Sequence, residues 1–198
     1  MSHRTYITLD QSDALERELF EAALLAAATS PTPSYICDIH HDVALLPKWC
    51  EEGRQRAKEN AEMRGKAWKP QDQHTPGQSF TADEIGRVAE GPVELMLGLD
   101  VAAVLKGRVD ARPDKTLDGI RFDVKGAENR PDNTFSLPVY KVKQNKYDAL
   151  ILVRYIKPGH VRVWACKCAP VKPAWCEMDG VRDKGPFYKV SCPDGLAP

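Results

Sequence analysis

Apolar residues recur at helical spacing in the first half of the chain and alternate with polar residues in the second half. The leucines from Leu15 to Leu25 predict a helix over 13–29, which must end at the Ser-Pro-Thr-Pro sequence that follows. A second, mostly charged helix is predicted over 47–65. A third is predicted over 81–106, because its first four residues, Thr-Ala-Asp-Glu, have the form of a capping box. A spacing of two then predicts five strands, over 109–117, 120–125, 135–142, 148–156 and 161–168.

A polar linker over 69–79 divides the chain, because its sequence KPQDQHTPGQS contains no apolar residue. We expect a helical extension over 1–75 and a domain of the α/β (α+β) class over 76–198, with a mixed sheet flanked by helices. A chain of 198 residues with 42% hydrophobic content can bury one core and a small lobe, which excludes large multidomain enzymes.

The formal net charge of zero hides a difference between the two halves of the chain. Residues 1–100 carry 10 Lys and Arg against 17 Asp and Glu, a net charge of −7. Residues 101–198 carry 18 against 11, a net charge of +7. This asymmetry favours contact between the second half and a polyanion, although two oppositely charged surfaces that merely balance would give the same counts.

No stretch of the sequence is long and apolar enough to cross a bilayer. The longest apolar run covers residues 22–28, whereas a span needs about 20 residues. The N-terminus turns acidic where a signal peptide would have its apolar stretch. We therefore expect a cytoplasmic protein without membrane contact, whose six cysteines are thiols or metal ligands rather than disulfides.

An Asp-Gly pair at 118–119 lies between two alternating runs, which is the strongest short-range signal for a β-hairpin. With these two residues as a type I′ turn, Leu117 pairs with Ile120, and the register continues until Asp114 faces Asp123. Alternation then places two sets of side chains on opposite faces of the second strand, Ile120, Phe122 and Val124 on a core face and Arg121, Asp123 and Lys125 on a polar face.

Two carboxylates directly opposite each other repel unless a cation compensates them. Their oxygens suit a hard divalent ion such as Mg²⁺ or Mn²⁺. Lys125, on the same face, could then orient a water or stabilise charge developing on a phosphate. The alternative is a solvated hairpin whose aspartates pair with Arg112, Arg121 and Lys125.

The sequence Pro113-Asp114, eight intervening residues and then Asp123-Val124-Lys125 resembles the signature of the PD-(D/E)xK nuclease superfamily. Members of this superfamily, restriction endonucleases and Holliday-junction resolvases among them, place a helix bearing a glutamate before the hairpin and a further strand after it, in an αβββαβ core. The predicted helix over 81–106 and the strand over 148–156 fit that order. The resemblance covers about residues 80–168.

The resemblance implies a restriction-endonuclease-like core and a Mg²⁺-dependent nuclease that hydrolyses phosphodiester bonds of DNA. It makes Asp114 and Asp123 metal ligands and Lys125 the catalytic lysine, with the carbonyl of Val124 as a further ligand. Among the helix acids, Glu90 fits the family pattern best as the remaining catalytic and metal-binding residue. Glu94, one helical turn later, is the alternative.

Two further patterns bear on partners and cofactors. Four cysteines in the second half supply soft ligands for a structural Zn²⁺ but lack the Cys-x-x-Cys spacing typical of such sites: Cys166, Cys168, Cys176 and Cys192. Basic and aromatic side chains over 140–164 are typical of a nucleic-acid surface, although lysines that protect edge strands would look the same: Lys141, Lys143, Lys146, Arg154, Lys157 and Arg162, with Tyr140, Tyr147, Tyr155 and Trp164.

The alternative function is therefore a nuclease-like fold without catalysis, which binds nucleic acid or a protein partner and is held together by cysteine-bound zinc. The sequence leaves open whether the chain forms a homodimer.

Overall fold

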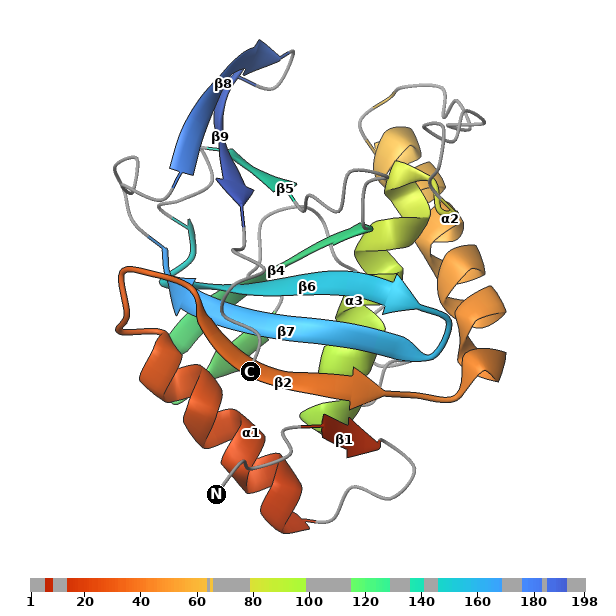
Figure 1. Ribbon diagram of the computed structural model, residues 1–198. Helices are drawn as coiled ribbons and strands as arrows, with labels where there is room; N and C mark the ends of the chain where they lie inside the picture. Colours follow the sequence, from red (N-terminus) through yellow and green to blue (C-terminus); the bar gives the residue numbers. More distant parts are fainter. Residues whose placement is uncertain are drawn as a thin grey trace.

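The computed structural model describes residues 6–8, 14–63, 65, 79–98, 115–128, 136–140, 146–168, 176–182 and 185–191. The fold is mixed α/β, as expected. Three helices in this described part, α1 (Ala14–Ala27), α2 (Leu46–Met63) and α3 (Ala82–Met96), accompany a mixed sheet, and a smaller sheet stands at one end of the molecule (Figure 1). A short 3-10 helix, Val43–Leu45, leads into α2.

The main sheet has the strand order β1-β2-β7-β6-β4-β3. Its strands are β1 (Tyr6–Thr8), β2 (Ser34–His40), β3 (Lys115–Leu117), β4 (Ile120–Glu128), β6 (Ala149–Lys157) and β7 (His160–Lys167). β4 runs parallel to β6, and β1 runs parallel to β2, whereas the other neighbours are antiparallel. The smaller sheet is antiparallel, in the order β5-β9-β8, with β5 (Ser136–Tyr140), β8 (Cys176–Arg182) and β9 (Gly185–Ser191).

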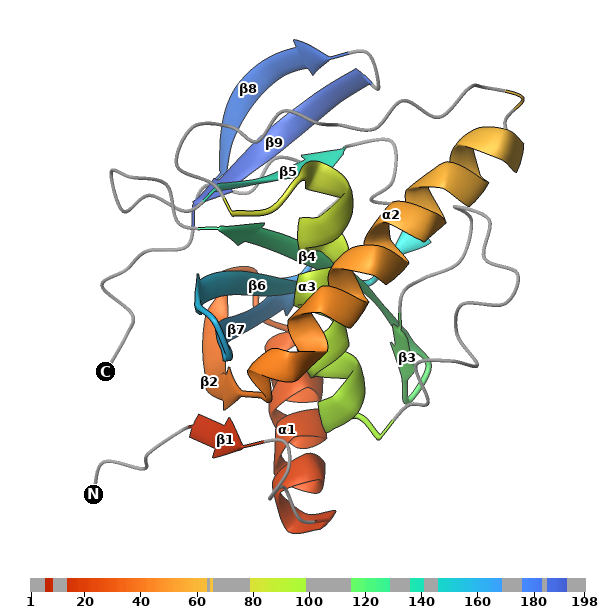
Figure 2. The same cartoon turned by 90° about the vertical axis from the view of Figure 1, so that its right-hand side faces the viewer.

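All three helices lie on one side of the main sheet, with α2 outside α3 (Figure 2). The core between helices and sheet includes Leu24 of α1, Val88 and Val93 of α3, and Phe122 and Ile151 of the strands, all completely buried. A second apolar cluster covers the opposite face of the sheet: Tyr147, Leu150, Leu152, Trp164, Cys166 and Cys168. Because the central strands are buried on both faces, β6 is an almost continuous apolar run rather than an alternating one.

The predicted capping box starts α3. The Thr81 hydroxyl accepts a hydrogen bond from the Glu84 amide at 3.4 Å, and the Glu84 carboxylate accepts one from the Thr81 amide at 2.9 Å. The helix ends at Met96, so its predicted continuation to residue 106 is wrong at residues 97–98. Gly98, with φ of 63°, turns the chain out of the helix, and residues 99–106 lie outside the described residues.

The first 75 residues are not the purely helical extension that the sequence predicts, because β1 and β2 belong to the main sheet. β2 pairs with β7 along its whole length, and α2 packs against α3. The predicted linker over 69–79 lies outside the described residues apart from Ser79. The strands predicted over 120–125, 135–142, 148–156 and 161–168 correspond to β4, β5, β6 and β7, whereas β8 and β9 were not predicted.

Candidate functional site at the β3–β4 hairpin

The predicted hairpin register is confirmed over its described part. Asp118 and Gly119 both have positive φ, 46° and 79°, as a type I′ turn requires. The pairs that follow are Leu117 with Ile120, Thr116 with Arg121 and Lys115 with Phe122. Continuation of this ladder would place Asp114 opposite Asp123, but Asp114 lies outside the described residues, as do the other residues over 99–114. The predicted pair of carboxylates therefore stays a prediction.

The predicted division of β4 into two faces is confirmed. Phe122 and Val124 belong to the core shared with the helices. Asp123 and Lys125 point to the opposite face, where their side chains form an ion pair. One strand thus places an acid and a base side by side, two residues apart.

The face that carries Asp123 is buried rather than solvated, because this residue is only 3% exposed. Lys125 retains more contact with solvent, with 23% of its side chain exposed, and its Nζ lies 6.0 Å from the ring centroid of Tyr147. The solvated hairpin considered from the sequence is therefore only partly correct. Arg121 takes a different partner, Asp148, through two side-chain hydrogen bonds of 2.9 Å.

The carbonyl of Val124 points away from β6. The Arg121 carbonyl accepts a hydrogen bond from the Asp148 amide at 2.8 Å, so it faces the β6 side. Carbonyl direction alternates along a strand, which turns the Val124 carbonyl toward the β3 side of β4. There it accepts a hydrogen bond from Lys125 Nζ at 3.3 Å. Two of the predicted metal ligands therefore lie on β4 within the described residues: the Val124 carbonyl oxygen and the Asp123 carboxylate.

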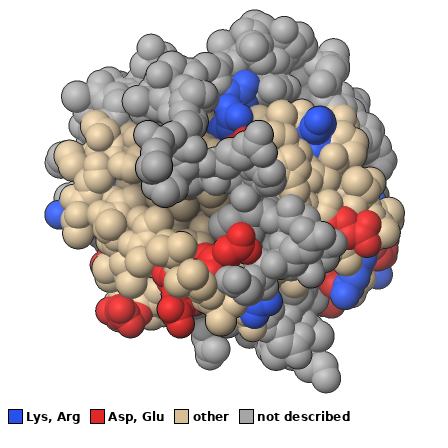
Figure 3. Space-filling model, turned by 60° about the horizontal axis from the view of Figure 1, so that its bottom comes forward, with Lys and Arg blue, Asp and Glu red and all other residues tan. Residues whose placement is uncertain are grey.

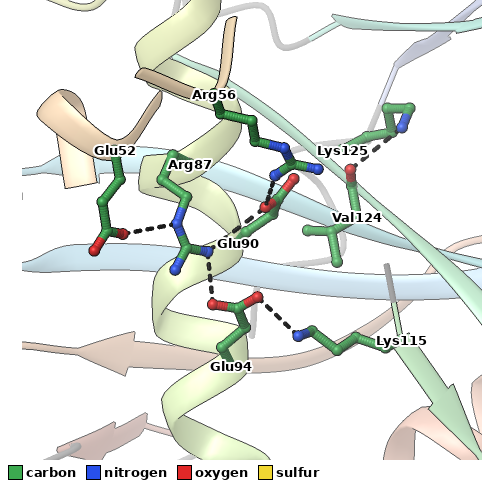
Figure 4. A network of polar contacts seen from close by, with 8 residues as sticks. All are labelled: Glu52, Arg56, Arg87, Glu90, Glu94, Lys115, Val124 and Lys125. Carbon is green, nitrogen blue, oxygen red and sulfur yellow. Dashed lines mark hydrogen bonds and ion pairs between the residues drawn. The ribbon is translucent and has the colours of Figure 1, made fainter. Parts of the chain in front are cut away.

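The helix acids Glu90 and Glu94 lie in a charged network between α2, α3 and β3. In Figure 4 their carboxylates extend from α3 toward basic side chains, with Val124 and Lys125 on the neighbouring strand. Glu90 is 2.6 Å from Arg56 Nη1 and 3.5 Å from Arg87 Nη1. Its side chain is 11% exposed.

Glu94 is held more tightly than Glu90. Its side chain is 1% exposed and contacts two cations, Arg87 at 2.6 Å and Lys115 at 2.8 Å. Arg87 also contacts Glu52 of α2 at 3.0 Å. Burial disfavours the charge of Arg87, but Glu94 and Glu90 raise its pKa above the usual value, so the guanidinium stays charged. Its contacts with these two buried cations give Glu94 a structural role that explains its position without catalysis.

Sequence reasoning missed the basic partners of these glutamates. Arg87, Glu90 and Glu94 follow one another at three- and four-residue spacing on α3, and Glu52 and Arg56 lie four residues apart on α2. That spacing marks one charged face on each helix, but it does not reveal that the two faces meet. The contact joins residues more than 30 positions apart, such as Arg56 and Glu90.

Cys168 lies close to the Asp123–Lys125 pair. Burial, reinforced by the negative charge of Asp123, raises the pKa of its thiol to about 11. Cys166 of β7 and Cys168, which directly follows this strand, belong to the same buried cluster, as the sequence predicts for residues two apart. The side chain of Cys176 and the whole of Cys192 lie outside the described residues, so the four-cysteine zinc site stays a prediction.

The donor set for a hard cation is incomplete within the described part of the chain. No group of three or more His, Cys, Asp or Glu side chains there is arranged to hold a metal ion. Mg²⁺, however, is commonly held by one or two carboxylates together with water. The oxygens of Asp123 and Val124 suit such an ion in chemistry, and the hairpin site would need Asp114 as its second carboxylate.

The aromatic side chains that the structure describes in the run over 140–164 are buried, so they do not form an exposed stacking surface. Trp164 is 1% exposed, and Tyr147, Tyr155 and Arg154 are also buried. Tyr155 belongs to the helix-facing core, whereas Trp164 belongs to the cluster on the other face of the sheet. Alternation on a sheet with two covered faces explains the difference, because aromatic residues on either face then become core residues.

Comparison of the chain with protein-family models, with characterised proteins and with solved structures finds no significant match. Among the described residues, no helix has the length and apolar character needed to span a membrane.

Proposed function

We propose that this protein is a divalent-metal-dependent nuclease that hydrolyses phosphodiester bonds of DNA, with a core of the PD-(D/E)xK type. The observation that carries the proposal is the hairpin. Its register, continued by one pair, would bring Asp114 opposite Asp123, and its alternation sets Asp123 beside Lys125 on one face. A buried carboxylate paired with a lysine two residues away is the arrangement that the D-x-K half of the signature requires.

The surrounding elements support the same proposal. α3 precedes the hairpin and packs directly on β4, and β4 pairs in parallel with β6, the next strand of the main sheet. One feature departs from the αβββαβ pattern. The described residues between β4 and β6 include strand β5, which pairs with β9 in the smaller sheet instead of joining the main one.

In this proposal Asp123 and Asp114 bind the cation, and the Val124 carbonyl adds a third oxygen. The bound cation would polarise the scissile phosphate and lower the pKa of the attacking water. Lys125 Nζ, held beside the Asp123 carboxylate, donates a hydrogen bond to that water or to a phosphate oxygen. The positive charge of Lys125 also stabilises the negative charge that develops on the phosphate in the transition state.

Glu90 suits the role of helix acid better than Glu94. Its main partner, Arg56, has a side chain that is 31% exposed, so the pair can open toward solvent. Glu94 is enclosed between two buried cations, and its release would take an anionic partner from both of them. We therefore assign the additional ligand to Glu90. Because α3 packs on the face of β4 opposite Asp123, this acid would have to approach the cation from the β3 side of the strand, where the Val124 carbonyl points.

The test is cleavage of end-labelled DNA, single- and double-stranded, by the full chain at increasing Mg²⁺ or Mn²⁺, with and without EDTA. The expected result is divalent-dependent cleavage that falls to background in Asp123→Asn and in Asp114→Asn. Asp148→Asn is the matched control. This carboxylate lies beside the same hairpin, but its side chain is 43% exposed and bonds to Arg121. The Asp148→Asn variant should cleave DNA at the parent rate.

Cleavage by Asp123→Asn at the parent rate would show that this carboxylate is not a ligand. Cleavage that persists in EDTA would show that the reaction needs no metal. Binding of DNA without cleavage at any divalent concentration would favour the non-catalytic alternative. Circular dichroism and urea unfolding of each variant separate loss of activity from loss of fold.

A further inference from the structure

Helix α1 carries an apolar stripe that faces solvent. Leu15 and Leu19 are each 61% exposed, and Ala22 and Ala26 on the same side are also exposed. Phe20 and Leu24, by contrast, fix the opposite side of the helix to the core. Figure 3 looks onto the end of the molecule where α1 lies, and there acidic side chains are separated by uncharged surface.

The stripe has the spacing of a helix-packing seam. The intervals from Leu15 to Leu19, Ala22 and Ala26 are four, three and four residues, the pattern of alternate a and d positions in a heptad. Isolated exposed leucines are common on protein surfaces, but a seam that runs from Leu15 to Ala26, along most of α1, is a surface that another helix can cover.

The order of large and small residues selects the partner. In an antiparallel pair of α1 helices centred between residues 20 and 21, Leu15 lies against Ala26 and Leu19 lies against Ala22. Every layer then combines one large and one small side chain, so the helices keep a uniform separation. A parallel pair would place leucine on leucine at one end and alanine on alanine at the other, and it would splay.

The charges favour the same arrangement. In the antiparallel pair, Glu16 lies level with Leu25 of the second copy, and Glu18 lies level with Ala23. No glutamate therefore meets another glutamate within a layer. A parallel pair in register would align each glutamate with its own copy, which is destabilising.

We propose that α1 is a self-association surface through which two copies of this chain pair with their α1 helices antiparallel. The proposal does not depend on the nuclease assignment. A single 14-residue helix is about 21 Å long, so one helix pair buries less than the roughly 1,200 Å² of a standard stable interface. The dimer is therefore weak and concentration-dependent.

Sedimentation equilibrium of the full chain, from about 10 µM to about 1 mM, measures this association directly. The parent protein should shift from monomer to dimer within that range, and Leu19→Glu should stay monomeric. Met63→Glu is the matched control because Met63, on α2, is also an exposed apolar residue, at 54%. Its association should equal that of the parent.

Two further variants test whether association depends on the pairing of large with small residues or only on the exposed apolar area. Ala22→Leu adds apolar area but places leucine against leucine, so the proposal predicts association weaker by about tenfold or more. The exchange variant Leu19→Ala/Ala22→Leu restores one large and one small residue in each layer and should recover the dimer. Stronger association of Ala22→Leu, failure of the exchange to recover it, or a parent that stays monomeric throughout would each overturn the proposal.

Discussion

Gly126 of β4 lies directly under α3, and Gly126→Ala should destabilise the protein strongly. A Cβ at this position would be 2.2 Å from the Ala89 Cβ and 3.0 Å from the Ile85 carbonyl oxygen. Carbon atoms in contact are normally about 3.5–4.0 Å apart, so helix and strand would have to separate by about 1.5 Å. Overpacking of this kind commonly costs about 1–3 kcal/mol, and we expect the upper end because backbone as well as side chain is in the way.

Urea unfolding, followed by tryptophan fluorescence, measures this cost. The comparison is valid when the slope of the unfolding free energy against urea concentration is the same for the variant and the parent. Gly86→Ala is the matched control. It makes the same chemical change on α3, where a Cβ would meet nothing within 4 Å, and it should stabilise the protein by about 0.5–1 kcal/mol through helix propensity.

A double variant tests the contact itself. Ala89→Gly removes the atom at 2.2 Å, so Gly126→Ala/Ala89→Gly should lose about 1–2 kcal/mol less than the sum of the two single changes. If Gly126→Ala unfolds within about 0.5 kcal/mol of the parent, or if the two changes are simply additive, then α3 does not seat on β4 as described. The position assigned to Glu90 relative to β4 would then fail with it.

Three further changes probe the ends and the charges of the same elements. Glu94→Gln removes the charge shared by Arg87 and Lys115, which are buried, and should lower the free energy of unfolding by about 3–5 kcal/mol in urea, whereas a loss below about 1 kcal/mol would contradict the network. Thr81→Ala removes the capping box and should cost about 1 kcal/mol in the same assay, and an unchanged midpoint would contradict the cap. The third change is Asp148→Asn. Hydrogen bonds from Arg121 lower the pKa of Asp148 in the folded protein to about 2. The stability that the Asp148 carboxylate adds is therefore present above about pH 4, where an unfolded aspartate titrates, and is lost as the pH falls toward 2. Urea unfolding at a series of pH values should show a small difference between parent and Asp148→Asn at pH 6 that vanishes near pH 2, and a difference that grows in acid would reverse the sign of the argument.

The parts of the fold that the sequence predicts are those set by local chemistry. The turn at 118–119 requires positive φ at two adjacent residues, and an Asp-Gly pair provides it, so turn and register follow from the same few positions. The capping box at Thr81 is equally local. Because the hairpin turn sets the register, the alternation of residues along β4 is enough to assign Asp123 and Lys125 to one face.

The parts that the sequence does not predict depend on distant segments or on irregularity. In β2 the pairing with β7 shifts between Tyr35 and Cys37, so Ile36 and Cys37 are both buried and the alternation that marks a strand is broken. Arg87 lies on the same helix as Glu90 and Glu94, but their other partners, Arg56 of α2 and Lys115 of β3, are connected to them by no local pattern. The burial of Asp123 depends on what covers the second face of the sheet, which a hairpin alone cannot reveal.

The charged network between α2 and α3 limits how these helices can move. Two apolar helix surfaces can slide or roll past each other through small steps, because one methyl group substitutes readily for another. Arg87 has to reach Glu52 and Glu94 simultaneously, and Arg56 has to reach Glu90, so a rotation of either helix breaks several directional contacts together. The network therefore favours one rotational orientation of α2 relative to α3, and it keeps the acids of α3 at a fixed distance from β4.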